Sequence, residues 1–248
     1  MKTKRRIIPS ITTLARKGST WRDKLVEVES LQIREFGLFA TGLNKEEREE
    51  CFSELKKLRE RHSFSIPFVH ATNEMTEEEY RYCIKSFGTE IFNLHPMRKY
   101  PLTHDLSAEI LGMIAIENST QDNYFLESDL EGFGRICFDL SHLEDIRRSD
   151  FPFYETTVAL AKKYPVRVNH ISAVAKPGTP GRSKRSVHMA DSDDDFDYLS
   201  QLSPLAFANL CAVELENSLQ EQLHFIKRIS LAMDTAISAA DTNKLDQT

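Results

Sequence analysis

The sequence has no apolar run that approaches the roughly 20 residues needed for a membrane-spanning helix. It begins with a basic stretch, but the apolar run that follows is too short for the core of a secretory signal peptide. These absences argue against a membrane protein and against export. We therefore expect a cytoplasmic protein without a membrane partner.

Cysteine is scarce, and its spacing does not fit a disulfide framework. The four cysteines are far apart, and each lies in an apolar run: Cys51, Cys83, Cys137 and Cys211. We expect all four to be unpaired thiols that pack as small buried side chains in a reducing compartment.

The chain also lacks the excess of positive charge typical of a dedicated nucleic-acid-binding protein. Its net charge is -6 and its pI is about 5.8. The apolar content of 40% and charged content of 28% are ordinary for a globular protein. A chain of 248 residues can form one large domain. We predict one domain over residues 1–239 and a flexible polar tail over 240–248, and the composition is compatible with a homo-oligomer.

Eight short apolar runs alternate with helix-like segments along the chain, which predicts parallel strands joined by crossover helices. The runs span residues 7–12, 35–40, 64–69, 90–94, 113–116, 136–138, 166–169 and 209–213. Eight repeats favour a single closed (β/α)₈ TIM barrel. An open doubly wound sheet is the alternative, but the glycine-rich phosphate turn that usually follows its first strand is missing after Thr12.

Most of these runs end in a side chain that can bind a metal ion. Asp139 follows the sixth run, and His142 comes three residues later. The others are His70, His95, Glu117, His170 and Glu214. Each has an ordinary structural explanation by itself, but in a barrel the carboxyl ends of the strands meet at one mouth. Buried carboxylates gathered there need a compensating positive charge. Glu216 could take the place of Glu214, which we prefer because it directly follows the apolar run.

In order and spacing, a set of motifs resembles the xylose isomerase-like TIM barrel superfamily, which includes sugar phosphate isomerases and epimerases and an endonuclease IV-like branch. The resemblance covers about residues 7–233. The motifs are Ile66–His70, Asn93–Pro96, Ala115–Asn118, Cys137–His142, Asn169–Ser172, His188 and Val213–Glu214.

The resemblance implies a site for one to three divalent ions. Glu117 would bridge two of them. One would be completed by His70 and His95, and the other by Asp139, His170 and Glu214. In the endonuclease branch, His142 and His188 correspond to ligands of a third ion. Mixed carboxylate and imidazole ligands favour manganese, zinc or iron over calcium or magnesium.

The sequence departs from the endonuclease branch at three places. Ser186 stands where that branch has an Asp two residues before its last histidine, which puts the third ion in doubt. Met97 and Arg98 replace a glycine and a small polar residue, and 71–73 replaces a DNA-probing segment. Nucleic acid is therefore the less favoured partner.

Three functions remain open. The first is a metal-dependent isomerase or epimerase acting on a small sugar or sugar phosphate, in which Glu117 and Glu214 pass a proton. The second is an endonuclease IV-like phosphodiester hydrolase acting on DNA. The third is a non-catalytic binding protein on the same barrel. The basic loop 176–185 could bind a phosphate through Arg182, Lys184 and Arg185, or be only a solvated loop.

Overall fold

The computed structural model describes residues 5–14, 17–118, 125–175 and 186–245 of the chain, with side chains up to residue 242. Nine strands form one sheet in the order β1-β11-β8-β7-β6-β5-β4-β3-β2, and every pair of neighbours is parallel. They are β1 (Arg6–Ile8), β2 (Ser10–Thr12), β3 (Gly37–Phe39), β4 (Phe68–His70), β5 (Ile91–Leu94), β6 (Ile114–Glu117), β7 (Ile136–Asp139), β8 (Val166–Ile171) and β11 (Leu210–Val213).

The first strand closes the barrel. The sequence predicts one strand over 7–12, but the structure divides it at Pro9, which has no backbone N–H to donate to a ladder. β1 pairs with β11, whereas β2 pairs with β3, so the two edges of the sheet are joined through the chain itself. The protein is a TIM barrel, as the alternation of strands and helices predicts.

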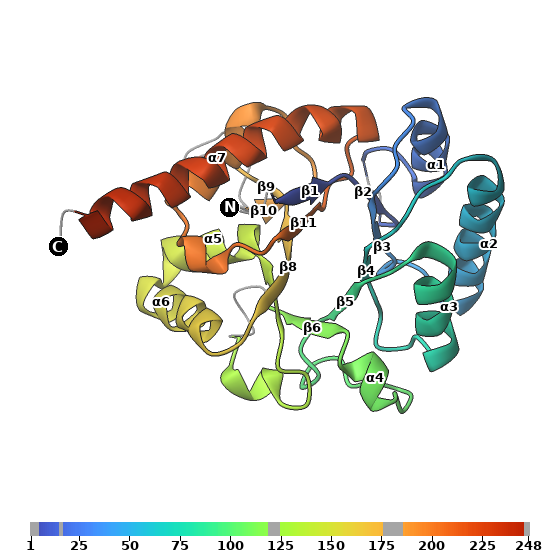
Figure 1. The fold of residues 1–248 in the computed structure, drawn as a ribbon, viewed down its shortest axis with the longest axis horizontal. Helices are drawn as coiled ribbons and strands as arrows, with labels where there is room; N and C mark the ends of the chain where they lie inside the picture. Colours follow the sequence, from blue (N-terminus) through green and yellow to red (C-terminus); the bar gives the residue numbers. More distant parts are fainter. Residues whose placement is uncertain (1–4, 15–16, 119–124, 176–185, 246–248) are drawn as a thin grey trace.

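The helices lie around the outside of the strands (Figure 1). They are α1 (Trp21–Ser30), α2 (Lys45–Arg61), α3 (Glu77–Phe87), α4 (Ala108–Leu111), α5 (Leu140–Ser149), α6 (Phe151–Ala159) and α7 (Leu219–Leu245). The sequence pattern predicts helix starts at Asn44, Thr76 and Ser218, and a hydrogen bond between the first residue and the residue three positions later is present at each. Asn44 accepts from the N–H of Glu47 at 3.0 Å, the Glu79 carboxylate accepts from the N–H of Thr76 at 2.8 Å, and Ser218 accepts from the N–H of Glu221 at 3.2 Å.

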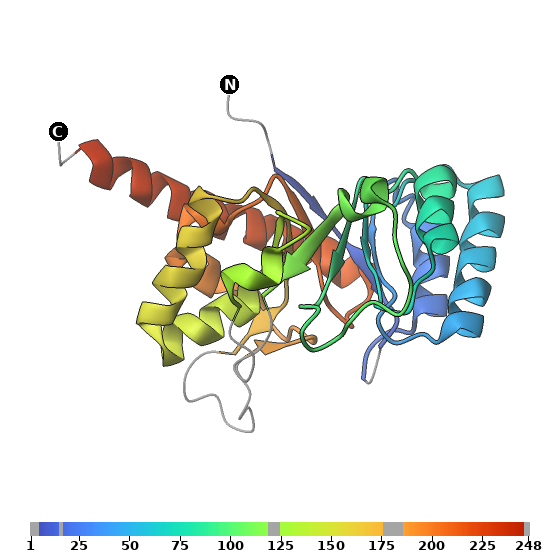
Figure 2. The ribbon, with the colours of Figure 1, turned by 90° about the horizontal axis from the view of Figure 1, so that it is seen from below.

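Two helices differ from the sequence prediction. The helix that the spacing of apolar residues predicts over 153–164 is present as α6 and the 3₁₀ turn Leu160–Lys162. By contrast, α5, which begins directly after Asp139, is a helix that the sequence pattern does not predict. The sequence pattern predicts a last helix from Ser218 to about Met233, but α7 continues to Leu245 and extends past the barrel (Figures 1 and 2). Residues 240–245, assigned from sequence to a tail, therefore continue α7.

Short 3₁₀ helices lie in several of the connections between strands. They are η1 (Glu127–Leu130), η2 (Leu160–Lys162), η3 (Asp193–Gln201) and η4 (Pro204–Ala206). A small antiparallel pair, β9 (Ala173–Val174) and β10 (Ser186–Val187), flanks the excursion after β8. The paired strands β9 and β10 therefore lie at the end of β8, where His170 is.

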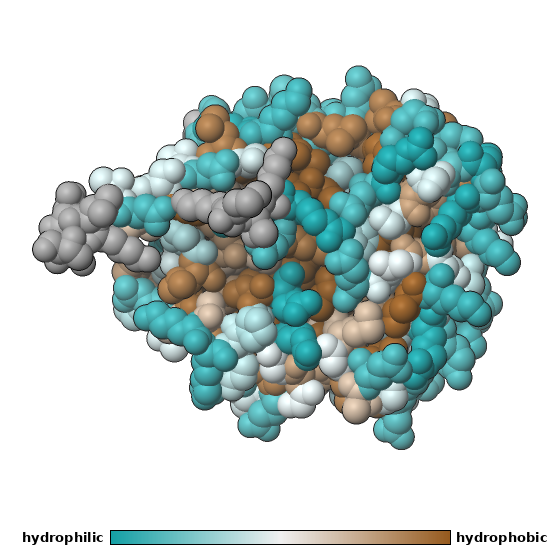
Figure 3. Space-filling model, in the orientation of Figure 1, coloured by the Kyte–Doolittle hydropathy of each residue, from teal (hydrophilic) through white to brown (hydrophobic). Residues whose placement is uncertain are grey.

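The buried apolar residues form two clusters. A large one fills the space between strands and helices, and a small one lies inside the barrel. The inner cluster consists of Ile8, Phe39, Phe68, Ile91, Ala115, Cys137, Val168, Leu210 and Ala212. Hydrophilic residues cover much of the outer helices, whereas hydrophobic ones gather toward the middle of the face in Figure 3. The barrel is therefore packed inside and can present a site only at its ends.

All four cysteines are free and buried, as predicted. Within the described ranges, none of the helices combines the length and the apolar character that a membrane span requires.

Candidate metal centre

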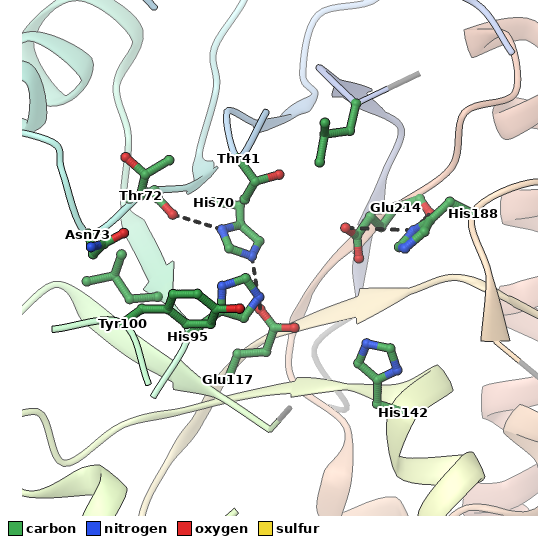
Figure 4. A pocket seen from close by; sticks show the side chains of 13 residues that line it. Thr41, His70, Thr72, Asn73, His95, Tyr100, Glu117, His142, His188 and Glu214 are labelled. Carbon is green, nitrogen blue, oxygen red and sulfur yellow. Dashed lines mark hydrogen bonds and ion pairs between the residues drawn. The ribbon is translucent and has the colours of Figure 1, made fainter. Parts of the chain in front are cut away.

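The side chains at the strand ends converge on one pocket of about 350 Å³. His70 lies at the end of β4, Glu117 at the end of β6, and Glu214 directly after β11. These three line the pocket together with His95, His142 and His188 (Figure 4). Parallel strands bring these residues together because their carboxyl ends share one edge of the barrel.

Glu117 is the centre of this cluster. It is 3% exposed, and its Oε2 lies 3.0 Å from His70 Nε2 and 3.9 Å from His95 Nε2. The same oxygen lies 3.5 Å from His170 Nδ1 and accepts a 2.8 Å hydrogen bond from Asn93 Nδ2. Asn93, on β5, therefore orients the carboxylate. A sequence search for ligands missed it because an amide is a weak metal donor.

The imidazoles set the charge state of Glu117. Burial by itself raises the pKa of this carboxyl, but the charge of neighbouring imidazoles, His170 first, outweighs burial, and the pKa lies well below its ordinary value. Burial lowers the pKa of His95 to about 4, so its ring is neutral at pH 7 and offers a lone pair. Burial alone also lowers the pKa of His170, but Cys137 and Glu117 raise it well above its ordinary value. The buried, ionised carboxylate of Glu117 therefore favours positively charged groups next to it.

Only one of the two carboxylate oxygens of Asp139 accepts hydrogen bonds from the described residues. It is the N-cap of α5, and its Oδ1 accepts from the N–H of Ser141 at 2.8 Å, from the Ser141 hydroxyl at 2.6 Å and from the N–H of His142 at 3.0 Å. The buried Oδ2 receives no hydrogen bond from the described residues and lies 3.4 Å from His142 Nε2. Asn118 fixes the backbone of Asp139 by bonds of 2.6 and 3.1 Å. The geometry leaves Oδ2 available to a cation.

Glu214, and not Glu216, presents its carboxylate to the pocket. Glu214 Oε2 lies 3.8 Å from His170 Nδ1, and Oε1 lies 3.8 Å from His188 Nδ1. The Glu216 carboxylate instead accepts the backbone N–H of Lys17 at 2.8 Å. Gly18 packs so closely there that a Cβ atom would lie 2.1 Å from the Glu216 carbonyl oxygen. Glu216 therefore anchors the loop after β2.

Four groups of three residues place one donor atom each within 4.8 Å of one another. They are His70–His95–Glu117, Glu117–Asp139–His142, Asp139–His170–Glu214 and Glu117–Cys137–His170. Every strand-end residue expected from the sequence belongs to at least one group. Cys137 was read only as a small buried side chain. Its position two residues before Asp139, on the same face of β7, could have indicated its place beneath the site.

His142, Ser186 and His188 are the positions that resemble a third ion site, and their contacts do not join them into one ligand group. Ser186 donates to Asp145 Oδ2 at 2.9 Å, and its hydroxyl lies 3.4 Å from His142 Nδ1. His188 Nδ1 lies 3.3 Å from the carbonyl oxygen of Glu214. In the part of the chain that the structure describes, none of the four groups contains both His142 and His188. The phosphate-binding candidates Arg182, Lys184 and Arg185 lie outside the described residues.

Neither protein-family models nor curated protein sequences give a match to this chain. Among solved structures, the chain is similar to a xylose isomerase domain protein from Alicyclobacillus acidocaldarius, with 12% identity, 92% of this chain and 99% of the other covered, and a TM-score of 0.47. It is similar to an IolI protein with a bound zinc atom, with 14% identity, coverage of 94% and 96%, and a TM-score of 0.43.

A third similar structure is endonuclease IV from Thermus thermophilus, with 14% identity, coverage of 93% and 99%, and a TM-score of 0.43. Xylose isomerase-like proteins and endonuclease IV are the two groups that the sequence motifs resemble. At these identities and TM-scores, likeness is not evidence of a shared activity, so the geometry of the pocket has to indicate the chemistry.

Proposed function

We propose that this barrel is a divalent-metal-dependent enzyme that acts on a sugar or sugar phosphate, as an isomerase or epimerase that works by metal-assisted proton transfer. The observation that carries the proposal is the approach of two carboxylates to one imidazole. His170 Nδ1 lies 3.5 Å from Glu117 Oε2 and 3.8 Å from Glu214 Oε2. The two acids reach the open centre of the pocket from different strands (Figure 4).

The unpartnered donors of this site fit a cation. Asp139 Oδ2 and both ring nitrogens of His170 are buried and have no hydrogen-bond partner among the described residues. Unpaired buried polar atoms are costly, and a metal ion would satisfy Asp139 Oδ2 and one of the two ring nitrogens of His170. Glu117, Asp139, His170 and Glu214 would hold the ion. Their mixture of oxygen and nitrogen donors suits manganese, zinc or iron.

The reaction would use the two glutamates as acid and base. A divalent ion in this place would polarise a carbonyl and its neighbouring hydroxyl, which lowers the barrier to removing the proton between them. One of Glu117 and Glu214 would remove the proton, and the other would return one. Asn93 would keep the Glu117 carboxylate in position through its 2.8 Å hydrogen bond.

Phosphodiester hydrolysis is the second candidate, and the group His70–His95–Glu117 favours it. His70 and His95 are not needed for a site with one ion, yet both nitrogens lie within 4 Å of Glu117 Oε2. A second ion held there would supply the two-metal chemistry that suits phosphodiester cleavage. This candidate predicts two or three ions per chain, whereas the isomerase needs one.

Metal analysis of the purified protein tests both candidates. We expect Glu117→Gln, which keeps the shape but not the charge, to weaken metal binding and to lower activity by orders of magnitude. In a one-ion isomerase, His70→Asn should leave the metal content near one per chain. In a two-ion hydrolase, the same change should remove one ion.

The activity itself is measured by exchange of carbon-bound hydrogen with deuterium oxide, using a panel of aldoses, ketoses and their phosphates. Glu214→Gln should abolish exchange, whereas the matched control Glu216→Gln should not, because Glu216 points to Lys17. A metal-loaded protein that exchanges no hydrogen but cleaves DNA would establish the hydrolase. Metal binding with neither activity would indicate a binding protein.

A further inference from the structure

The pocket lining includes two exposed apolar side chains that the proposed proton transfer does not use. Tyr100 and Leu14 both line the cavity, and they are 40% and 51% exposed. Scattered apolar side chains are ordinary on a convex surface, but in a concave site they are typical of ligand contact. These side chains are therefore available to a ligand that has an apolar face of its own.

Tyr100 is held in place before any ligand binds. Its backbone N–H donates to the carbonyl oxygen of Pro96 at 3.2 Å. Thr103 donates to the carbonyl oxygen of Asn73 through its N–H at 3.0 Å and its hydroxyl at 3.2 Å, so the loop that carries Tyr100 is joined to the loop after β4. The ring centroid lies 5.3 Å from that of His95 (Figure 4). Lys99 Nζ also lies over the ring, 5.2 Å from its centroid. A loop backbone that is fixed before binding reduces the conformational entropy lost when a ligand stacks on the ring.

The rest of the lining suits hydroxyl groups. Thr41, Thr72 and Asn73 also line the pocket, and the buried Thr72 Oγ1 has no hydrogen-bond partner among the described residues. The carboxylates and imidazoles of the candidate metal centre form another part of the lining. A ligand that matches this lining carries hydroxyls on its edge and an apolar C–H face. A sugar in its closed ring form has this arrangement.

On the basis of the proposed function, we propose that the substrate first binds as a furanose or pyranose ring whose C–H face stacks on Tyr100. The ring then opens, with loss of the anomeric hydroxyl proton and protonation of the ring oxygen, to give the carbonyl form on which the proton transfer acts. Tyr100 is then a specificity-determining residue that selects closed rings over acyclic polyols. The stacking surface is common to free sugars and sugar phosphates, so the experiment has to separate these two sources.

The test is saturation-transfer-difference NMR on zinc-loaded protein with glucose, xylose, fructose, the 6-phosphates of glucose and fructose, and uridine. At least one sugar should receive saturation on ring C–H protons. Tyr100→Ala should raise its Kd about tenfold or more, because the stacking contact is lost. Tyr100→Phe should bind nearly as well as the unchanged protein. Binding of the free sugars or of the 6-phosphates shows whether the ligand is a free or a phosphorylated sugar.

Phe151→Ala is the matched control, because Phe151 is 50% exposed on α6 and does not line the pocket. Thermal unfolding checks that each variant is folded. The inference is overturned if no sugar binds, if Tyr100→Ala binds as well as the unchanged protein, or if uridine binds alone through its base. A sugar that stacks on Tyr100 without exchanging hydrogen would support the inference and contradict the proposed reaction.

Discussion

The pKa of the Lys24 ammonium depends on where the fold places its side chain. Its side chain on α1 is fully buried, and Nζ donates to Thr12 Oγ1 at 2.9 Å and to the carbonyl oxygen of Leu215 at 2.7 Å. Leu215 directly follows Glu214, so this contact supports the loop that presents Glu214 to the pocket. Burial lowers the pKa of the Lys24 ammonium to about 8.

This pKa predicts a pH-dependent stability. Between about pH 8 and pH 10.5, the unfolded chain retains the Lys24 proton that the folded protein has released. The free energy of unfolding should therefore rise with pH across this window, by at most on the order of 3 kcal/mol. Urea unfolding at pH 7.5 and pH 10 measures the rise, and Lys24→Met should lack this part of it.

Leu215 remains satisfied in the variant, because Thr12 Oγ1 and Gln222 Nε2 also donate to its carbonyl oxygen, each at 3.1 Å. The difference between the two proteins therefore reports the titration of Lys24. Parallel stability curves for Lys24→Met and the unchanged protein would contradict the pKa assignment.

At the scale of elements, the junction of β7 and α5 combines a helix cap with a candidate ligand. Asp139 ends the strand, caps the helix with Oδ1 and leaves Oδ2 to the pocket. The cap explains why α5 begins where the sequence gives no obvious helix start, because the capping side chain belongs to the preceding strand.

Two substitutions should separate these roles. Asp139→Asn keeps an amide oxygen for the cap, so we expect the free energy of unfolding without metal to change by less than about 1 kcal/mol. Asp139→Ala loses the cap and should cost roughly 1–2 kcal/mol. Both should weaken metal binding. Urea unfolding with a chelator and metal analysis measure the two effects separately. Equal metal affinity in Asp139→Asn would show that Oδ2 is not a ligand.

At the scale of the molecule, the candidate ligands come from five strands or strand ends spread around the barrel: His70, Glu117, Asp139, His170 and Glu214. An ion bound by them would join segments far apart in the sequence. Because such a site exists only in the folded protein, metal binding should stabilise the whole barrel.

We therefore expect manganese at a hundred times its Kd to raise the free energy of unfolding by about 2.7 kcal/mol, and a chelator to reverse the rise. Scanning calorimetry with and without manganese measures it. The rise should be much smaller in Glu117→Gln. An equal rise in both proteins would place the ion elsewhere on the chain.

The fold was predictable because the barrel repeats a local pattern. Eight apolar runs, each followed by a polar side chain, determine parallel strands and the edge at which their ends meet. The helix starts at Asn44, Thr76 and Ser218 were also readable, because a cap and its partner are three residues apart. By contrast, α5 and the division at Pro9 depend on contacts with other strands.

The sequence by itself determined the type of barrel and which side chains face its mouth, since both follow from periodicity along the chain. Only the tertiary structure decided that Glu214 enters the pocket while Glu216 holds Lys17, because two carboxylates two residues apart on one strand end look alike until their partners are placed. It also decided that Asn93 and Cys137 touch the site, and that Tyr100 lines the pocket. These contacts join residues from different strands and loops, and no local pattern encodes a distance between them.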